Sequence, residues 1–277
     1  MSLRAPTLPA WEDLSAASRY YWSYQYELGR RVLVPELQRR GIFHAGDAVA
    51  EIGCGEGGVL MSFAEAGASS ALGTDIAPSR LESARRIAAQ LGLKITFAVH
   101  DILADPIPES WRGHYHVVLL RDVLEHLESP ETALRRIAQL LRPGGYLYIS
   151  FPPYPSPYGG HQHLLHNFWG KLPYVHLLPE PVFERLIASG REPDRSEVRR
   201  LRRIRLSFGR FRRAAAEAGY RIVLQKHYLL RPVFRFRFGL PLPAIELTPL
   251  ARLLPEVFQF LCMEASYVLQ WSAECSS

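Results

Sequence analysis

The sequence predicts an α/β fold built on a mostly parallel, doubly wound sheet. Between residues 48 and 151, short β-branched runs alternate with amphipathic stretches, which is typical of strand–helix–strand units around a parallel sheet. A glycine-rich turn, AVAEIGCGEGG, contains the end of the first run. Acidic residues close later runs at Asp75 and Asp101, the edge at which an open α/β sheet collects its ligands.

The first part of this pattern contains two strands and two helices. The first strand extends from Ala48 to Ile52, and a helix from Gly58 to Ala66 follows the glycine turn. The second strand extends from Ser70 to Asp75. Pro78 begins the next helix, because proline is favoured at the first helical position. The apolar residues of this helix share one stripe before Gly92 ends it: Leu81, Ala84, Ile87, Ala88 and Leu91.

Three further strands complete the regular part of the pattern. The third strand extends from Ile95 to Asp101, and the fourth, with the apolar centre VVLL, from His116 to Asp122. A continuous apolar run of this kind is typical of a strand buried on both faces. A helix begins after Ser129 and ends before Pro143. The fifth strand then extends from Tyr146 to Phe151.

The alternation is interrupted twice after the fifth strand. Residues 152–190 are rich in proline, glycine, histidine and aromatic residues and show no sustained periodicity, which is more typical of a functional lid than of a connector. A helix at 208–218 and a strand at 221–230 follow. Residues 231–257 form the second interruption, and 265–271 the last strand. The sheet is therefore predicted to have seven strands.

The composition is that of a globular protein. With 277 residues, 48% hydrophobic and 22% charged, the chain can bury a substantial core. Its cysteines, Cys54, Cys262 and Cys275, have no paired spacing, which indicates neither a disulfide framework nor a thiolate zinc site. The N-terminus lacks the apolar region of a signal peptide, and no apolar run reaches the roughly 18 residues of a membrane span. We therefore expect a cytoplasmic protein.

Positive charge is concentrated in one segment. Ten arginines lie between Arg191 and Arg213, against Glu192, Asp194 and Glu197, which exceeds the net charge of +6 for the whole chain. Such a segment can attract phosphate, nucleic acid or lipid headgroups. A solvated helix face explains the same residues without a partner, and both interpretations stay open here.

The glycine turn fits two nucleotide-binding patterns. Gly53, Gly55 and Gly58 match G-x-G-x-x-G, which indicates a dinucleotide such as NAD. Gly53, Gly55 and Gly57 equally match G-x-G-x-G. Either spacing lets the backbone approach a ligand closely, so the choice of ligand depends on the residues around the turn.

Three carboxylates near the turn favour S-adenosylmethionine. Glu51 lies inside the first strand, where a carboxylate is costly unless it accepts hydrogen bonds or meets a cationic ligand. Asp75 ends the second strand, where it can accept both ribose hydroxyls of either cofactor. Asp101 ends the third strand, where it can accept the exocyclic amine of adenine. Ile76 and Ile102 can sandwich the adenine ring.

Five segments in order resemble the motif series of class I, Rossmann-like S-adenosylmethionine-dependent methyltransferases. They are EIGCGEGG, GTDIAPSRLESAR, HDIL, YHVVLLRDVLEHL and LLRPGGYLYISFPP. The resemblance covers roughly residues 48–153. It implies a Rossmann-like, doubly wound sheet with an N-terminal helical cap at 1–45. The methyltransferase domain would then occupy 46–277, with lid insertions after strands 5 and 6 at about 152–205 and 231–257.

The resemblance also implies roles for individual residues. Asp75 would hold the ribose, Asp101 with Ile102 the adenine, and Glu51, Gly53 and Gly55 the methionine moiety. Arg121 and Asp122 would line the pocket near the methionine and the acceptor, although Arg121 is larger than the residue expected at that position.

Histidines after the fifth strand are the candidate catalytic residues. The segment GGHQHLLH contains His161, His163 and His166, and in an extended segment His161 and His163 would share one face. They could act as a general base for a hydroxyl acceptor, ligate a divalent metal, or be ordinary loop histidines. We predict His161 and His163 as catalytic residues and no metal. His126 is expected to support the pocket.

The favoured function is methylation, most simply O-methylation, of a small molecule or glycan that carries a hydroxyl and can be anionic. One alternative is a nucleic-acid methyltransferase that binds phosphates through the arginine segment, although that segment lacks interleaved stacking residues. Another is a non-enzymatic protein that binds anionic membrane surfaces or partner proteins and keeps a vestigial nucleotide pocket. An NAD-linked oxidoreductase is a fourth possibility.

Overall fold

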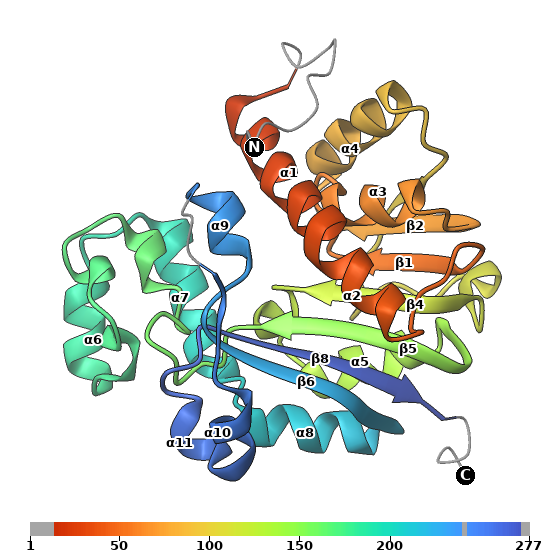
Figure 1. The fold of residues 1–277 in the computed structure, drawn as a ribbon. Coiled ribbons are helices and arrows are strands. Elements are labelled where there is room, and N and C mark those ends of the chain that lie inside the picture. Colours follow the sequence, from red (N-terminus) through yellow and green to blue (C-terminus); the bar gives the residue numbers. More distant parts are fainter. Residues whose placement is uncertain (1–13, 240–242, 273–277) are drawn as a thin grey trace.

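The computed structural model describes residues 14–239 and 243–272. It contains one eight-stranded sheet with the order β3-β2-β1-β4-β5-β8-β6-β7 (Figure 1). The first five of these positions are parallel, and β8 runs antiparallel to both β5 and β6. The strands are β1 (Ala48–Ile52), β2 (Ser70–Asp75), β3 (Thr96–Val99), β4 (Tyr115–Arg121), β5 (Leu141–Phe151), β6 (Tyr220–Leu230), β7 (Ile245–Glu246) and β8 (Glu264–Trp271).

The predicted α/β architecture is confirmed, but the predicted count of seven strands is wrong. The eighth strand is β7, a two-residue segment of the second interruption that pairs with β6 through Tyr228 and Glu246. Both of its residues are exposed, and two residues are too few to show an alternating pattern. β5 is also longer than predicted, because Leu141 already pairs with Tyr115 ahead of an irregularity in the ladder.

Helices cover both faces of the sheet. α1, α3 and α4 pack on one face and α5 and α8 on the other, as the two hydrophobic clusters show. The helices are α1 (Ala16–Leu28), α2 (Val34–Arg39), α3 (Gly58–Glu65), α4 (Pro78–Gln90), α5 (Pro130–Ala138), α6 (Glu180–Ile187), α7 (Glu192–Ile204), α8 (Phe208–Glu217), α9 (Val233–Arg237), α10 (Thr248–Leu253) and α11 (Pro255–Phe258).

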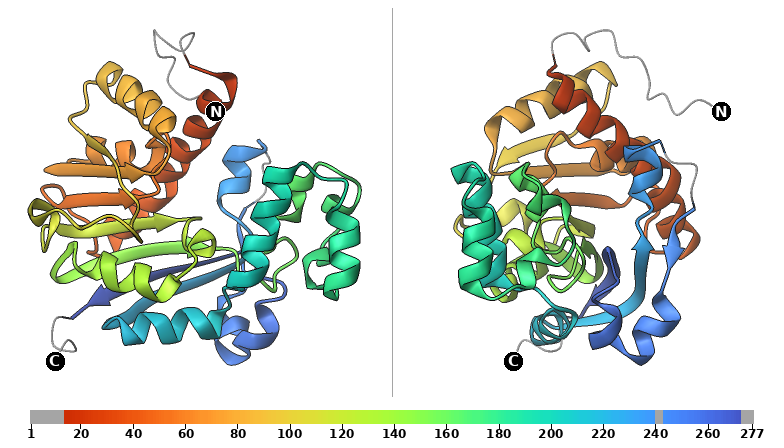
Figure 2. Two further views of the ribbon diagram at one scale, coloured as in Figure 1. Left: turned by 180° about the vertical axis from the view of Figure 1, so that it is seen from behind. Right: turned by 90° about the vertical axis from the view of Figure 1, so that its left-hand side faces the viewer.

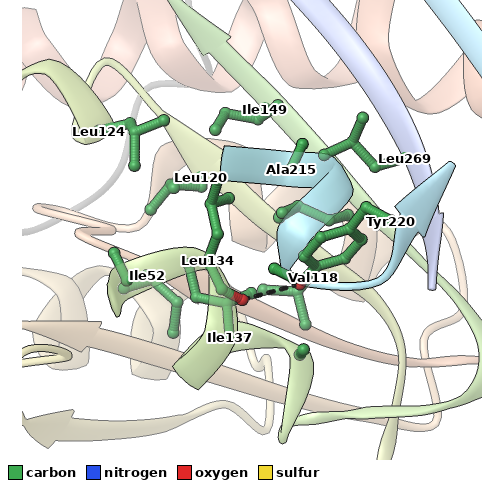
Figure 3. Close-up of a cluster of buried hydrophobic side chains, with 14 of the residues drawn as sticks. Ile52, Val118, Leu120, Leu124, Leu134, Ile137, Ile149, Ala215, Tyr220 and Leu269 are labelled. Atoms are coloured by element: carbon green, nitrogen blue, oxygen red, sulfur yellow. Dashed lines mark hydrogen bonds between the residues drawn. The ribbon is translucent and has the colours of Figure 1, made fainter. Parts of the chain in front are cut away.

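Alternation along the buried strands divides the core between these faces. Val118 and Leu120 of β4 join the cluster under α5 and α8, whereas Val117 and Leu119 join the cluster under α1, α3 and α4. Figure 3 shows the first cluster, in which Tyr220 donates a hydrogen bond from its hydroxyl to the carbonyl of Leu134 at 3.3 Å. A buried tyrosine hydroxyl needs such a partner.

The first interruption contains more regular structure than its composition predicts. It forms three short 3₁₀ turns and then α6, and the arginine segment that follows forms α7. These elements lie together at one end of the sheet (Figure 2). The parallel strands end there, so the first interruption lies beside the edge of the sheet that carries the predicted site residues (Figure 1).

The strand order positions the site. Successive connections reverse direction between β1 and β4, which are neighbours in the sheet. A crevice forms outside the carboxyl ends of strands at such a reversal. The glycine turn after β1 and the segment after β4 both open into it.

Gly58 keeps α3 close to α1, so we predict that Gly58→Ala destabilises the fold. A Cβ on Gly58 would lie 2.7 Å from the carbonyl oxygen of Trp22 and 2.9 Å from the amide of Tyr26, both backbone atoms that cannot turn aside. We expect a loss of about 1–3 kcal/mol in the free energy of unfolding, measured by urea titration.

Gly209 is the matched control, because it also lies in a helix. Its added Cβ would meet only the far ends of two side chains, Glu256 at 3.2 Å and Arg213 at 3.8 Å. We expect Gly209→Ala to change the free energy of unfolding by about 1 kcal/mol or less. Equal effects of the two substitutions would contradict the role given to Gly58.

Candidate functional site

A cavity of about 240 Å³ opens at the crevice between the ends of β1 and β4. Six of the eight predicted cofactor residues line it: Gly53, Asp75, Ile76, Asp101, Ile102 and Arg121. Glu51 and Gly55 do not line it. Ile76 is 70% exposed, an unusual state for a large apolar side chain beside a cavity.

Asp75 joins the glycine turn to the end of β2. Its carboxylate accepts hydrogen bonds from the amides of Gly55 and Ala77, each at 2.9 Å. Gly53 and Gly55 both have positive φ, at 70° and 55°. This left-handed backbone favours glycine, so the turn can take its shape only with these residues.

Glu51 has a partner inside the protein. It is buried, and it accepts a hydrogen bond from the amide of Leu60 at 3.0 Å. Burial raises the pKa of Glu51 to about 7, although the nearby Arg121 guanidinium acts in the opposite direction. Glu51 therefore connects β1 to α3 beneath the glycine turn rather than facing the cavity.

Arg121 holds α1 over the cavity. Its buried guanidinium donates a hydrogen bond to the side-chain oxygen of Gln25 in α1. It also lines a second, smaller cavity of about 130 Å³ between the N-terminal helices and the sheet. Arg121 is larger than the residue expected at this position because its side chain joins the N-terminal helices to the end of β4.

Arg80 was not predicted from the sequence as a site residue. Its guanidinium contacts Glu56 at 2.7 Å and lies 4.5 Å from the ring centroid of Tyr21. A Cβ on Gly55 would lie 2.4 Å from this guanidinium. Arg80 belongs to the first turn of α4, where an arginine shows no pattern beyond that of an ordinary polar helix residue.

Asp122 lies at the boundary between the first cavity and the second interruption. It has a positive φ of 52°, which is rare outside glycine. Both of its carboxylate oxygens accept hydrogen bonds from Arg231, at 2.7 and 2.8 Å, and Arg231 also contacts Glu264 at 2.7 Å. Burial would raise the pKa of Asp122, but the Arg231 and Arg121 guanidinium groups lower it below its usual value.

A further cavity of about 360 Å³ lies next to the first. Both predicted catalytic histidines, His161 and His163, line it. They belong to a 3₁₀ turn rather than to an extended segment, and His161 itself has a left-handed backbone. His166 does not line the cavity. Burial, followed by the neighbouring His126 and His163, lowers the pKa of His161 to about 3, so His161 is neutral near pH 7.

The two cavities meet at a pair of histidine rings. His126 lines the first cavity and His161 the further one, and their ring centroids are 4.9 Å apart. His126 Nδ1 lies 2.5 Å from Glu197 Oε1 of α7. Burial would lower the pKa of His126, but the hydrogen bond and charge of Glu197 and the charge of Glu125 raise it. No sequence signal marks Glu197, which is 71 residues away.

Among the residues that the structure describes, one group of side chains could hold a metal ion. Glu125, His126 and His161 each offer a ligand atom, and these atoms lie within 4.8 Å of one another. This set differs from the three loop histidines considered from the sequence, because only His161 belongs to both. Burial raises the pKa of Glu125 to about 7.

Much of the arginine segment is neutralised within the chain. Six of its ten arginines pair with carboxylates: Arg191, Arg195, Arg199, Arg200, Arg203 and Arg210. Arg202 donates instead to the carbonyls of His176 and Leu178. This charge therefore joins α7 and α8 to α5, α6 and the turns around them. No helix in the described part of the chain has the length and apolar character needed to cross a membrane.

The fold and this site define a class of protein. Residues 50–147 match the family model described as a methyltransferase domain. This match covers about a third of the chain, and the fold is that of class I, Rossmann-like S-adenosylmethionine-dependent methyltransferases, a class whose cofactor is S-adenosylmethionine.

Among the relatives are two ubiquinone biosynthesis O-methyltransferases. The one from Shewanella pealeana is 34% identical over 110 residues, which is 40% of this chain and 44% of the relative. The one from Vibrio parahaemolyticus is 36% identical over 110 residues, 40% of this chain and 45% of the relative. The matched region thus spans less than half the length of these relatives.

Solved structures show the same fold at low identity. An S-adenosylmethionine-dependent methyltransferase from Mesorhizobium loti has a TM-score of 0.52 at 18% identity, over 85% of this chain and 96% of that one. A geranyl diphosphate methyltransferase in complex with GPP and sinefungin has a TM-score of 0.52 at 14% identity, over 84% of this chain and 75% of that one.

The His126–Glu197 contact predicts a pH-dependent contribution to stability. Because the pKa of His126 is raised in the folded protein, protonation of His126 stabilises the fold. This stabilisation is fully present below the pKa of about 6.5 in the unfolded chain, and it is lost as the pH rises through the folded pKa. The pKa of Glu197 is lowered to about 2, mainly by His126 against the effect of burial, so its contribution persists down to that pH. We expect Glu197→Gln to cost about 1 kcal/mol at pH 6 and less at pH 9.

Thermal unfolding at the two pH values measures this difference, which corresponds to about 2–4 °C. Glu192→Gln in the same helix is the control, because the partners of Glu192 in the described chain are Arg195 and Arg199, which stay charged at both pH values. A Glu197→Gln effect that is equal at pH 6 and pH 9 would show that protonation of His126 does not contribute.

Proposed function

We propose that this chain transfers a methyl group from S-adenosylmethionine to a hydroxyl of a small molecule. The observation that carries the proposal is the meeting of two cavities at His126 and His161. One cavity contains the predicted cofactor residues and the other the predicted catalytic histidines. A methyl transfer needs donor and acceptor sites that adjoin in this way, because the acceptor atom must lie in line with the methyl group.

The residues of the first cavity fit the cofactor. Asp75 and Asp101 supply carboxylate oxygens for hydroxyl and amine donors, and the exposed Ile76 with the buried Ile102 supplies apolar surface for a ring. Gly53 has no side chain that would keep the cofactor away from the backbone. A Cβ at this position would also lie 2.4 Å from the Val123 side chain, so the space beside Gly53 fits glycine alone. When bound, S-adenosylmethionine supplies an activated methyl group. The protein then mainly needs to orient the acceptor and exclude water.

His161 is our candidate for the general base. Its neutral imidazole can accept the proton that a hydroxyl loses as its oxygen is methylated. The low pKa limits its strength as a base, so alignment of the acceptor would contribute more to the rate than proton transfer. His163 lines the same cavity 5.6 Å away, measured between ring centroids, and would contact the acceptor.

A small-molecule acceptor is favoured for two reasons. The relatives in the matched region are named as O-methyltransferases of ubiquinone biosynthesis. In a nucleic-acid enzyme the arginine segment would be the phosphate-binding surface. Here most of its arginines form ion pairs with carboxylates of the same chain.

We also assign the helices before β1 as a cap and the insertions at about 152–205 and 231–257 as lids. Support comes from their contacts: the Tyr20 hydroxyl donates to the carbonyl of Arg237 at 2.5 Å, and the Tyr174 hydroxyl to the carbonyl of Phe260 at 2.8 Å. The first 13 residues of the predicted cap lie outside the described residues.

Asp75→Asn is predicted to weaken binding of S-adenosylmethionine by about 10- to 100-fold. The substitution removes the charge that would strengthen hydrogen bonds from the ribose hydroxyls. Calorimetry with S-adenosylmethionine and with NAD measures the effect and the choice of cofactor. Glu82→Ala, an exposed change in α4, is the control and should leave affinity unchanged. Tighter binding of NAD than of S-adenosylmethionine by the unsubstituted protein would refute the proposed function.

His161→Asn is predicted to lower kcat by about 100-fold or more while leaving affinity for S-adenosylmethionine nearly unchanged. Asparagine tolerates the left-handed backbone of this position, so the fold should persist. The acceptor for this assay is first identified by transfer of labelled methyl groups to metabolite extracts. His166→Asn, at an exposed left-handed histidine outside the cavity, is the control. Parallel loss of cofactor affinity would instead indicate a structural role for His161.

A further inference from the structure

The cavity that contains His161 and His163 has flat apolar walls. Its other lining residues include Pro152, Tyr158, Phe234, Phe238 and Met263, which come from the two insertions and from the segment before β8. Aromatic rings and proline present planar surfaces that bind other planar rings well. Its volume of about 360 Å³ is within the range of small-molecule sites. The walls therefore favour a planar, largely apolar acceptor.

The same cavity contains two arginines in different electrostatic states. Arg231 contacts Asp122 and Glu264, so its charge is already compensated. Arg237 has no ion pair within residues 14–239 and 243–272, and its buried Nε has no hydrogen-bond partner there. Its guanidinium lies 5.8 Å from the ring centroid of Tyr24 and 5.3 Å from that of Phe238. One cationic group in the cavity is therefore available to a ligand.

The contacts around the histidines show which end of this cavity faces the first cavity. His161 contacts His126 at the boundary with the first cavity, and His163 lies 5.6 Å farther along, measured between ring centroids. Arg237 lies beside Tyr24 and Phe238, and none of these three residues lines the first cavity. Arg237 is therefore away from the boundary, whereas a hydroxyl to be methylated must lie near it.

We propose that the acceptor is an aromatic hydroxy acid whose ring lies between the apolar walls and whose carboxylate binds Arg237. This inference rests on the proposed function and specifies its substrate class. A carboxylate matches the charge of Arg237, which has no ion pair among the described residues, because a carboxylate carries one negative charge and accepts two parallel N–H groups of a guanidinium. A phosphate monoester carries about −1.5 to −2 at pH 7 and would leave buried charge unpaired.

Direct binding tests the proposal without requiring turnover. The probes are 3,4-dihydroxybenzoate, its neutral amide and catechol phosphate, titrated into the full chain in the presence of S-adenosylhomocysteine. We expect the acid to bind at least tenfold more tightly than the amide. Arg237→Gln should remove this preference by weakening binding of the acid, and Arg237→Lys should restore part of it, because lysine keeps the charge but not the planar pair of donors.

Arg235→Gln is the matched control, since Arg235 lies in the same short helix, is exposed and does not line the cavity. It should leave the preference for the acid unchanged. Thermal unfolding of both variants checks that α9 stays folded. Equal affinities for acid and amide, no binding of the acid, a preference that survives Arg237→Gln, or tighter binding of the phosphate would each overturn the assignment.

Failure of this inference can be told apart from failure of the proposed function. If S-adenosylmethionine binds and neutral phenols are methylated as well as the acid, only the role of Arg237 is wrong. If S-adenosylmethionine does not bind, the proposed function fails. Even then, tight binding of the acid that depends on Arg237 would identify the ligand of this cavity.

Discussion

The contact of Arg231 with Asp122 and Glu264 joins the parts from which the site is assembled. Asp122 follows β4, Glu264 begins β8, and Arg231 begins the second insertion directly after β6. Without Arg231, two carboxylates would lie close together in a poorly solvated region, which is costly. The pair also holds Asp122 in a left-handed backbone at the boundary between the two cavities. The direction of the second insertion, and with it the position of Arg237, depends on this contact.

Charge is distributed differently on the two sides of that boundary. The first cavity receives carboxylates from the tips of β2 and β3, which suits a ligand with hydroxyl, amine and cationic groups. The further cavity receives neutral histidines and one arginine without a carboxylate partner in the described chain. The His126–His161 pair separates the two environments. A donor that carries positive charge and an acceptor that carries negative charge would each meet the complementary side.

Most of the strands, and the gathering of six of the eight expected cofactor residues around one cavity, could be predicted from the sequence because their signals are local. A strand buried on both faces, such as β4, needs an unbroken apolar run, and a left-handed turn, such as that at Gly53 and Gly55, needs glycine. β7 and α6 could not be predicted, because a two-residue strand and a helix inside a proline-rich segment owe their formation to the surfaces on which they pack. The partners of the arginine segment are equally nonlocal.

The sequence by itself determined the parallel sheet, the glycine turn and the acidic residues at the strand ends, since periodicity and backbone preference depend on neighbours along the chain. Only the tertiary structure decided that Glu51 faces α3 rather than the cavity and that Glu197 contacts His126. It also decided that Arg231 pairs with carboxylates, whereas Arg237 has no carboxylate partner in the described part of the chain. The pairings of His126 and Arg231 join residues 33 to 109 positions apart. They depend on how insertions fold back over the sheet, which no local pattern encodes.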